Sequence, residues 1–133
     1  MSKRIMAALA ALAVSAGAAS AQQVKLGLIL PYTFGGVELG QQMDRAAELY
    51  LKQNAAQIAP YKITLVKRDS KAPNGAEAKV AAQELLTQSK VDVLAGWSYS
   101  PDAIASAPIV TAGKKLGVIM NAGTSFITNL ITA

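Results

Sequence analysis

A regular alternation of two kinds of segment constrains the fold of this 133-residue chain more than any other feature. Short apolar, strand-like runs occupy residues 24–30, 61–69, 91–95 and 116–120, and helical patterns separate them. Strands joined by helical crossovers require parallel pairing with right-handed connections. The sequence therefore predicts the α/β class, with an open parallel sheet that carries helices on both faces.

The apolar patterns also predict which face of each element is buried. From Val37 onward, apolar residues recur at helical spacing in a helix that is expected to end before Pro60. A second helical stripe is formed by Ala78, Ala81, Ala82 and Leu85. In the run 61–69, apolar and polar residues alternate, which gives the strand one exposed face and favours a position at the edge of the sheet.

The third helix has a clear start signal in Ser100-Pro101-Asp102. Ser is a preferred N-cap, Pro is pre-set for the first turn, and Asp complements the positive end of the helix dipole. We expect Ser100 to be the N-cap and the helix to run to about Lys115. Another helix is predicted to begin at Thr124-Ser125.

The first 21 residues have the order of a secretory signal peptide. Lys3 and Arg4 precede an apolar run, and small residues follow it up to Ala21. The run is too short to span a bilayer, which takes roughly 20 apolar residues. We therefore expect residues 1–21 to be removed on export and residues 22–133 to form an exported domain that is not inserted in the membrane. An N-terminal helix that anchors the chain is the alternative.

Charge and cysteine content exclude several classes of function for the segment 22–133. It carries eleven Lys and Arg against eight Asp and Glu, a net charge of +3, and the basic residues are scattered. No basic stripe indicates nucleic-acid binding. The chain contains no Cys, so the fold depends on its core without disulfides. About 110 residues are enough for one domain.

Three loops rich in Gly and hydroxyl side chains follow predicted strands, at residues 31–36, 96–100 and 121–125. Ligands of open parallel sheets bind at the carboxyl ends of the strands, where these loops lie. Two of the loops lead into helix N-termini, which suit an anion such as a carboxylate. Ser100 and Thr124 could instead serve only as helix caps. Trp97 and Tyr99 could be ordinary core or lid aromatics, or a stacking wall for a ligand.

The chain resembles periplasmic solute-binding proteins of the branched-chain amino-acid type, the receptors of ABC importers. The resemblance rests on the order and spacing of several segments across residues 22–133 and not on one specific motif. These segments are the run 24–31, Gly40, Ala95-Gly96 with Ser100, Ala107-Pro108-Ile109, and the run 118–124. The resemblance implies the N-terminal lobe of a type I periplasmic-binding-protein fold.

The resemblance also implies a set of ligand-binding residues. Those expected to hold a carboxylate are Ser100, Ala122 and Thr124, with Trp97 and Tyr99 shaping the pocket and Tyr32 near its rim. Leu39 lies where amino-acid receptors of the family often have an aromatic ring. The segments 31–33 and 121–124 look more like those of members that take aromatic acids. The expected ligand is therefore a branched-chain amino acid or a small aromatic or other carboxylate.

Members of the family have two lobes that close around the ligand, and they run to nearly three times this length. We therefore expect the chain to be an incomplete form that contains the first lobe only, with weak binding because half of the site is absent. In the intact form, the resemblance implies a membrane permease of an ABC importer as partner. It implies no cofactor, no metal and no enzymatic activity.

Two readings from other classes stay open beside this one. Strand 24–30, the glycine-containing turn and Asp69 superficially resemble half of a dinucleotide-binding enzyme, although Gly35, Gly36 and Gly40 do not have the G-x-G-x-x-G spacing. Asp69 is more simply a surface or capping residue at a strand end. Hydrolytic chemistry has little support, because the chain lacks His and Cys and shows no metal cluster. The other alternative is an exported remnant that binds nothing.

Overall fold

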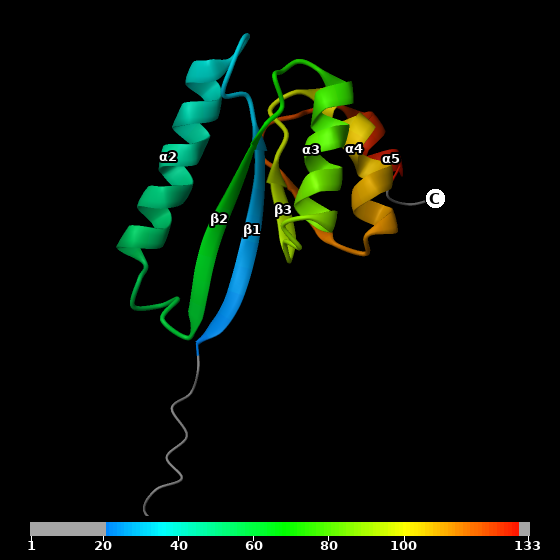
Figure 1. The fold of residues 1–133 in the computed structure, drawn as a ribbon. Helices are drawn as coiled ribbons and strands as arrows, with labels where there is room; N and C mark the ends of the chain where they lie inside the picture. Colours follow the sequence, from blue (N-terminus) through cyan, green and yellow to red (C-terminus); the bar gives the residue numbers. More distant parts are fainter. Residues whose placement is uncertain (1–20, 131–133) are drawn as a thin grey trace, which may run out of the picture.

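A computed structural model of the protein describes residues 21–130 and shows the predicted α/β architecture (Figure 1). The expected signal peptide, apart from Ala21, lies outside the described residues. In chain order, the elements are β1 (Gln22–Leu30), α2 (Val37–Gln53), β2 (Tyr61–Asp69), α3 (Gly75–Thr87), β3 (Val93–Gly96), α4 (Ser100–Ala112), β4 (Leu116–Ile119) and α5 (Ser125–Leu130).

The four strands form one sheet in the order β2-β1-β3-β4, and every neighbouring pair is parallel. The central strand is β1, with β2 along its whole length and β3 along residues 26–29. The predicted parallel sheet is confirmed, and so is the edge position of strand 61–69. All four carboxyl ends therefore meet at one edge of the sheet, which we call the carboxyl edge.

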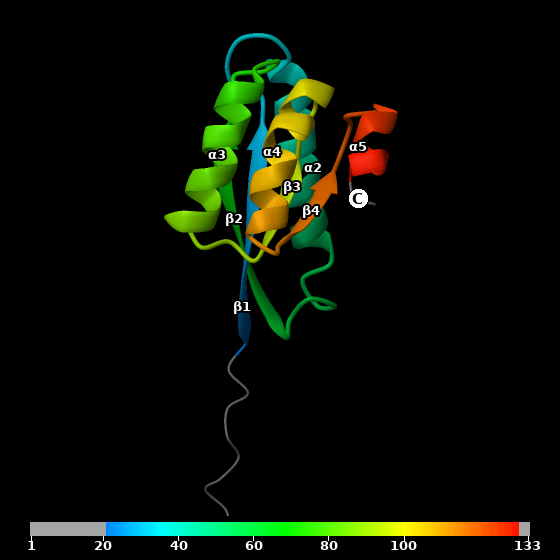
Figure 2. The same ribbon diagram turned by 90° about the vertical axis from the view of Figure 1, so that its right-hand side faces the viewer.

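Helices cover both faces of the sheet, as predicted. Figure 1 shows α2 on one face and α3 with α4 on the other, with α5 next to α4, and Figure 2 shows α5 beyond β4. Alternate residues of β1 serve the two layers, because successive side chains of a strand point to opposite faces. Leu28 and Leu30 pack with Met43 and Ala47 of α2, and Ile29 belongs to the core on the other face.

The larger core lies between the sheet and the layer formed by α3 and α4. The predicted stripe of α3 is confirmed, because the four buried residues of this helix are Ala78, Ala81, Ala82 and Leu85. The three alanines are small, and Gly27 of β1 makes room for Leu85, because a Cβ on Gly27 would lie 3.0 Å from a Leu85 methyl group. Leu94 and Val110 complete this core from β3 and α4.

Several predicted boundaries need correction. The N-cap of α4 is Tyr99, and Ser100 is the first helical residue. The helix ends at Ala112 and not near Lys115, because Gly113 is its C-cap. The strand predicted over 91–95 pairs only over Val93–Gly96, although Val91 is fully buried just before it. These shifts of one to three residues reflect hydrogen-bonding geometry that apolar patterns do not encode.

The helix α2 approaches the sheet closely at Gly40. A Cβ at this position would lie 2.0 Å from the carbonyl oxygen of Pro31, the residue that follows β1. Only glycine allows the helix and the strand end to meet at this distance. This contact fixes the start of α2 against the carboxyl edge. None of the helices in the described part of the chain is long and apolar enough to span a membrane.

The close approach at Gly40 predicts the effect of one methyl group. Alanine in a helix interior normally stabilises a helix by about 1 kcal/mol relative to glycine. Here we expect Gly40→Ala to lower the free energy of unfolding by about 2 kcal/mol, because the methyl group would overlap the Pro31 carbonyl. Urea denaturation measures this change. Gln42→Ala, on the exposed side of the same helix, is the control and should change stability by less than about 0.5 kcal/mol. Equal stability of the Gly40→Ala and wild-type chains would contradict the close contact.

Candidate functional site

The three predicted loops lie together at the carboxyl edge because β1, β3 and β4 are parallel neighbours. The β3 and β4 loops are joined by hydrogen bonds. The N–H of Met120 donates to the carbonyl of Gly96 over 2.8 Å, and the N–H of Ala122 donates to the carbonyl of Trp97 over 3.1 Å. The side-chain amide of Asn121 donates to the carbonyl of Ser98 over 2.9 Å. The two loops that contain the predicted carboxylate-binding residues are therefore held in register.

The N-terminus of α4 opens on this edge with Ser100 as its first residue. Its N-cap, Tyr99, has an extended backbone and provides no side-chain cap, and Pro101 occupies the first turn. The Ser100 hydroxyl makes no hydrogen bond to another described residue and is partly exposed. The first turn of α4 therefore presents a hydroxyl group and backbone N–H groups without an N-cap side chain, while its own acidic residue, Asp102, accepts from the N–H of Asn74. Free N–H groups and a hydroxyl are suitable chemistry for an anion.

Thr124 lies at the start of α5, as predicted. Its Oγ1 accepts a hydrogen bond from the N–H of Phe126 over 3.4 Å, so the hydroxyl caps this short helix. Thr124 and Ala122 are both partly exposed. They remain available at the surface of the edge, next to the loop that leads into α4.

Trp97 occupies a different environment from the one the resemblance implied. Its side chain is only 2% exposed and belongs to the core under α4, where its indole Nε1 has no hydrogen-bond partner among the described residues. The ring also lines an apolar cavity of about 230 Å³, which lies between α4, β4 and Ile127 of α5. The core-aromatic alternative therefore describes this side chain better than a ligand-stacking wall.

Tyr32 projects its ring away from the other two loops and toward α2. The ring packs against the core that Leu28 and Leu30 share with α2, and its hydroxyl is buried. Burial, followed by the negative charge of Asp44, raises the pKa of this hydroxyl above its usual value. The phenol is therefore neutral at physiological pH. Tyr32 lies in the predicted loop 31–36. Its backbone N–H, and not its ring, contacts the end of β2, where it donates to Asp69.

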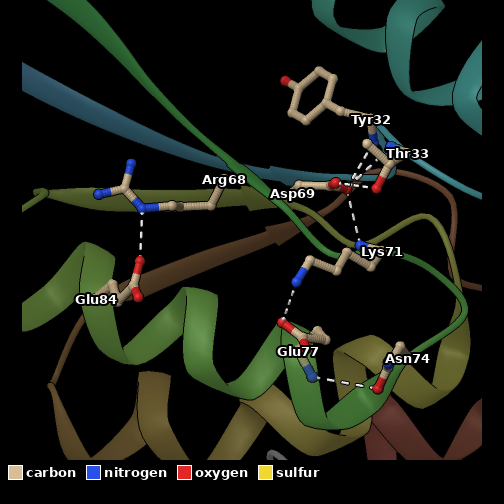
Figure 3. A network of polar contacts seen from close by, with 8 residues as sticks. All are labelled: Tyr32, Thr33, Arg68, Asp69, Lys71, Asn74, Glu77 and Glu84. Carbon is tan, nitrogen blue, oxygen red and sulfur yellow. Dashed lines mark hydrogen bonds and ion pairs between the residues drawn. The ribbon is translucent and has the colours of Figure 1, made fainter.

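Asp69 is the functional candidate whose importance sequence reasoning missed. Figure 3 shows its carboxylate between the loop after β1 and the loop after β2. Oδ1 accepts hydrogen bonds from the N–H groups of Tyr32 (2.9 Å), Thr33 (3.3 Å) and Lys71 (2.9 Å), and Oδ2 accepts one from the Thr33 hydroxyl. The expected role as a strand-end capping residue is confirmed, and the cap joins two loops instead of one. The available signal was its position at the end of the strand beside β1, next to a candidate loop.

The hydrogen bonds also determine the charge state of Asp69. Burial disfavours the charged form, but the Thr33 hydroxyl and the N–H groups of Lys71, Tyr32 and Thr33 together outweigh it and hold the pKa of Asp69 below its usual value. Both oxygens are used within the protein. These hydrogen bonds give Asp69 a role within the fold, so its position at the end of β2 is no longer support for the ribose contact of the dinucleotide-binding alternative.

Asp102 is another carboxyl group near this edge, and unlike Asp69 it is buried. It is fully buried in the first turn of α4, and its Oδ1 accepts a hydrogen bond from the N–H of Asn74 over 2.9 Å. Its Oδ2 and the buried Ser70 hydroxyl have no partner of good geometry among the described residues. Burial raises the pKa of Asp102, against smaller opposing effects of the Asn74 N–H and of Ser70. Asp102 thus joins the first turn of α4 to the loop after β2, in addition to the expected interaction with the helix dipole.

No group of three or more His, Cys, Asp or Glu residues in the range 21–130 has the arrangement of a metal site. The chemistry of the carboxyl edge is instead that of hydroxyl groups, backbone N–H groups and a helix N-terminus. Such an arrangement can hold an anion through hydrogen bonds.

Comparison with known proteins identifies similar sequences and structures. The sequence model of the family described as "Periplasmic binding protein" matches residues 23–129. The Leu/Ile/Val-binding protein homolog 6 of Brucella abortus is 34% identical over 127 residues, which cover 96% of this chain and 33% of that protein. The chain therefore spans about a third of the length of this curated relative.

Two solved structures show the same architecture. A solute binding protein of an ABC transporter from Rhodopseudomonas palustris BisB5, in complex with 3,4-dihydroxy benzoic acid, is 40% identical with a TM-score of 0.75. The match covers 80% of this chain and 29% of that one. Another solute binding protein from Rhodopseudomonas palustris, in complex with 4-hydroxybenzoate, is 30% identical with a TM-score of 0.76. This match covers 81% of this chain and 29% of that one.

The buried carboxyl group predicts a pH-dependent stability. The pKa of Asp102 is higher in the folded chain than in the unfolded one, so its favourable contribution is present below about pH 4 and is lost as the pH rises. We expect Asp102→Asn, which can still accept from Asn74, to raise the free energy of unfolding at pH 7 on the order of 1 kcal/mol. The gain should shrink toward pH 4 in denaturation curves. Asp92→Asn, at an exposed site, should show no such gain. A gain at Asp102 that is independent of pH would contradict this account.

Proposed function

Because this chain belongs to the family of periplasmic binding proteins, we propose that it forms the first lobe of a substrate-binding protein of an ABC importer. In this role the lobe binds a small carboxylate in the periplasm and catalyses no reaction. A second lobe would close on the ligand, and the permease of the importer would receive it. The leader at residues 1–21 would direct the chain to that compartment.

The observation that supports this proposal best is the N-terminus of α4. Its first turn lies at the carboxyl edge, lacks a side-chain cap and begins with the partly exposed Ser100. Two backbone hydrogen bonds join the β4 loop, which contains Ala122, to the β3 loop that leads into this turn, and Thr124 follows two residues after Ala122. A carboxylate at this place would receive hydrogen bonds from the Ser100 hydroxyl and from backbone N–H groups. Tyr99 would form one wall of the site.

We further propose that the ligand is an aromatic carboxylate of the benzoate type. Two of the structures similar to this chain, at 40% and 30% identity, were solved with 3,4-dihydroxy benzoic acid and 4-hydroxybenzoate. The residue before Gly40 is the aliphatic Leu39, where the resemblance places an aromatic ring in many amino-acid receptors of the family. An amino acid would also need an acceptor for its ammonium group. Asp69 and Asp102 both accept hydrogen bonds from backbone N–H groups, and Glu38 is exposed on α2.

A branched-chain amino acid is the second candidate ligand, favoured by the 34% identity to a protein named as a Leu/Ile/Val-binding protein homolog. In that case the ammonium group would be bound mainly by the second lobe. The two candidates differ in a simple way. An aromatic acid carries no ammonium group and would depend less on a carboxylate outside this lobe.

Titration of the purified chain tests the proposal. We expect 4-hydroxybenzoate and 3,4-dihydroxybenzoate to raise the melting temperature in a saturable manner, with a millimolar Kd or weaker because a single lobe leaves the ligand open to water. Leucine and isoleucine should give a smaller shift. Saturating shifts with the amino acids and none with the aromatic acids would favour the second candidate. No shift with any carboxylate would leave the chain without the proposed activity.

Replacement of one hydroxyl group tests the location of the site. We expect Ser100→Ala to weaken binding of 4-hydroxybenzoate by about 1–2 kcal/mol, because a hydrogen bond to a charged group is lost. Calorimetry or a chemical-shift titration would give the Kd. Ser89→Ala, beyond α3 and just before β3, is the matched control and should leave the Kd unchanged. Equal affinity of the Ser100→Ala variant and the wild type would remove Ser100 from the site.

A further inference from the structure

The loop at residues 31–36 is fastened at its beginning by Asp69. The last pair of the β1 and β2 ladder joins Leu30 to Asp69, so the carboxylate lies directly beside the point where the loop leaves the sheet. Three of the four hydrogen bonds that the carboxylate accepts come from Tyr32 and Thr33, the second and third residues of the loop. Figure 3 shows these donors converging on one carboxylate.

The end of the same loop packs against the side chain of Tyr99. A Cβ on Gly36 would lie 2.4 Å from the Tyr99 hydroxyl oxygen, so this side chain contacts the backbone at the start of α2. Gly36 has a φ of 86°, a conformation that suits glycine. Tyr99 precedes Ser100, the residue proposed to hold the carboxylate. The loop therefore runs from Asp69 to the N-terminus of α4.

Two residues next to these contacts have left-handed backbone conformations, which residues other than glycine rarely adopt. Phe34, which follows Thr33, has a φ of 61° and a side chain that is 78% exposed. Lys71, whose N–H donates to Asp69, has a φ of 48°. Such conformations persist where the surroundings impose them, and here the hydrogen bonds to Asp69 lie beside both.

From this geometry we infer that Asp69 is a positioning residue of the ligand site, which holds the β1 loop in place beside Tyr99 and Ser100. This inference rests on the proposed function, because it assigns the loop to the same ligand. Asp69 would act through the loop without touching the ligand. Binding would benefit because a loop that is already ordered loses less conformational freedom when the ligand binds.

Amide hydrogen exchange tests whether Asp69 holds the loop. In Asp69→Ala we expect the amides of Tyr32 and Thr33 to exchange on the order of tenfold faster, because each loses an acceptor. Asp92→Ala is the matched control. Asp92 accepts a hydrogen bond from the N–H of Lys25 over 2.8 Å, toward the opposite end of the strands, so only the Lys25 amide should lose protection. Unchanged exchange of Tyr32 and Thr33 in Asp69→Ala would overturn the inference.

Ligand titration of the same variants tests whether the loop matters for binding. We expect Asp69→Ala to weaken the binding of 4-hydroxybenzoate on the order of tenfold and Asp92→Ala to leave it unchanged. Asp69→Asn retains an acceptor at Oδ1 and should keep most of the affinity. An Asn variant as weak as the Ala variant would assign the effect to charge and contradict a positioning role. So would an Asp69→Ala variant that binds as tightly as the wild type.

A milder pair of variants covers the case in which Asp69→Ala does not fold. Thr33→Val removes the hydroxyl that donates to Asp69, and Thr33→Ser keeps it. We expect weaker binding and faster loop exchange for the Val variant only, and equal behaviour of the two would overturn the inference. If the wild-type chain binds none of the carboxylates, the proposed function fails. The exchange data then still decide whether Asp69 holds the loop.

Discussion

The parallel pairing of β1 with β2 on one side and β3 on the other is the interaction on which the rest of the structure depends. It brings the carboxyl ends of all strands to one edge, and it places the loops after β1, β3 and β4 next to each other. The same central strand divides its side chains between the two helical layers. Leu28 and Leu30 face α2, while Ile29 faces the core under α3 and α4. The candidate site follows from this topology before any single side chain is considered.

A few short contacts then fix the positions of the loops at the carboxyl edge. Gly40 lets α2 meet Pro31, and Asp69 ties the first loop to the end of β2. Backbone hydrogen bonds join the β3 and β4 loops, beside the first turn of α4. Each contact links segments that are far apart in the sequence. The edge thus depends on tertiary contacts made by a few polar groups and glycines, while the layers depend on apolar burial.

The fold could be predicted from the sequence because it depends on periodic apolar patterns. The stripe of α3 and the edge position of β2 both follow from residues that repeat at the period of a helix or a strand. The residues of the candidate site were harder to predict from the sequence. Trp97 has the composition of a binding loop around it, yet its ring is in the core, and the cap of α4 is Tyr99 instead of Ser100. The hydrogen bonds that show the role of Asp69 come from residues 36 and 37 positions away in the sequence, and no local pattern reveals them.

The central claim is that a small aromatic carboxylate binds at the first turn of α4, between the loops of β1 and β4. Chemical-shift mapping of the isotopically labelled chain during titration with 3,4-dihydroxybenzoate tests it most directly. Binding at this place should give saturable shifts concentrated in the backbone amides of residues 31–36, 98–102 and 121–125. Shifts confined to the apolar cavity beside Trp97 and Val110, or spread without saturation over the surface, would contradict it.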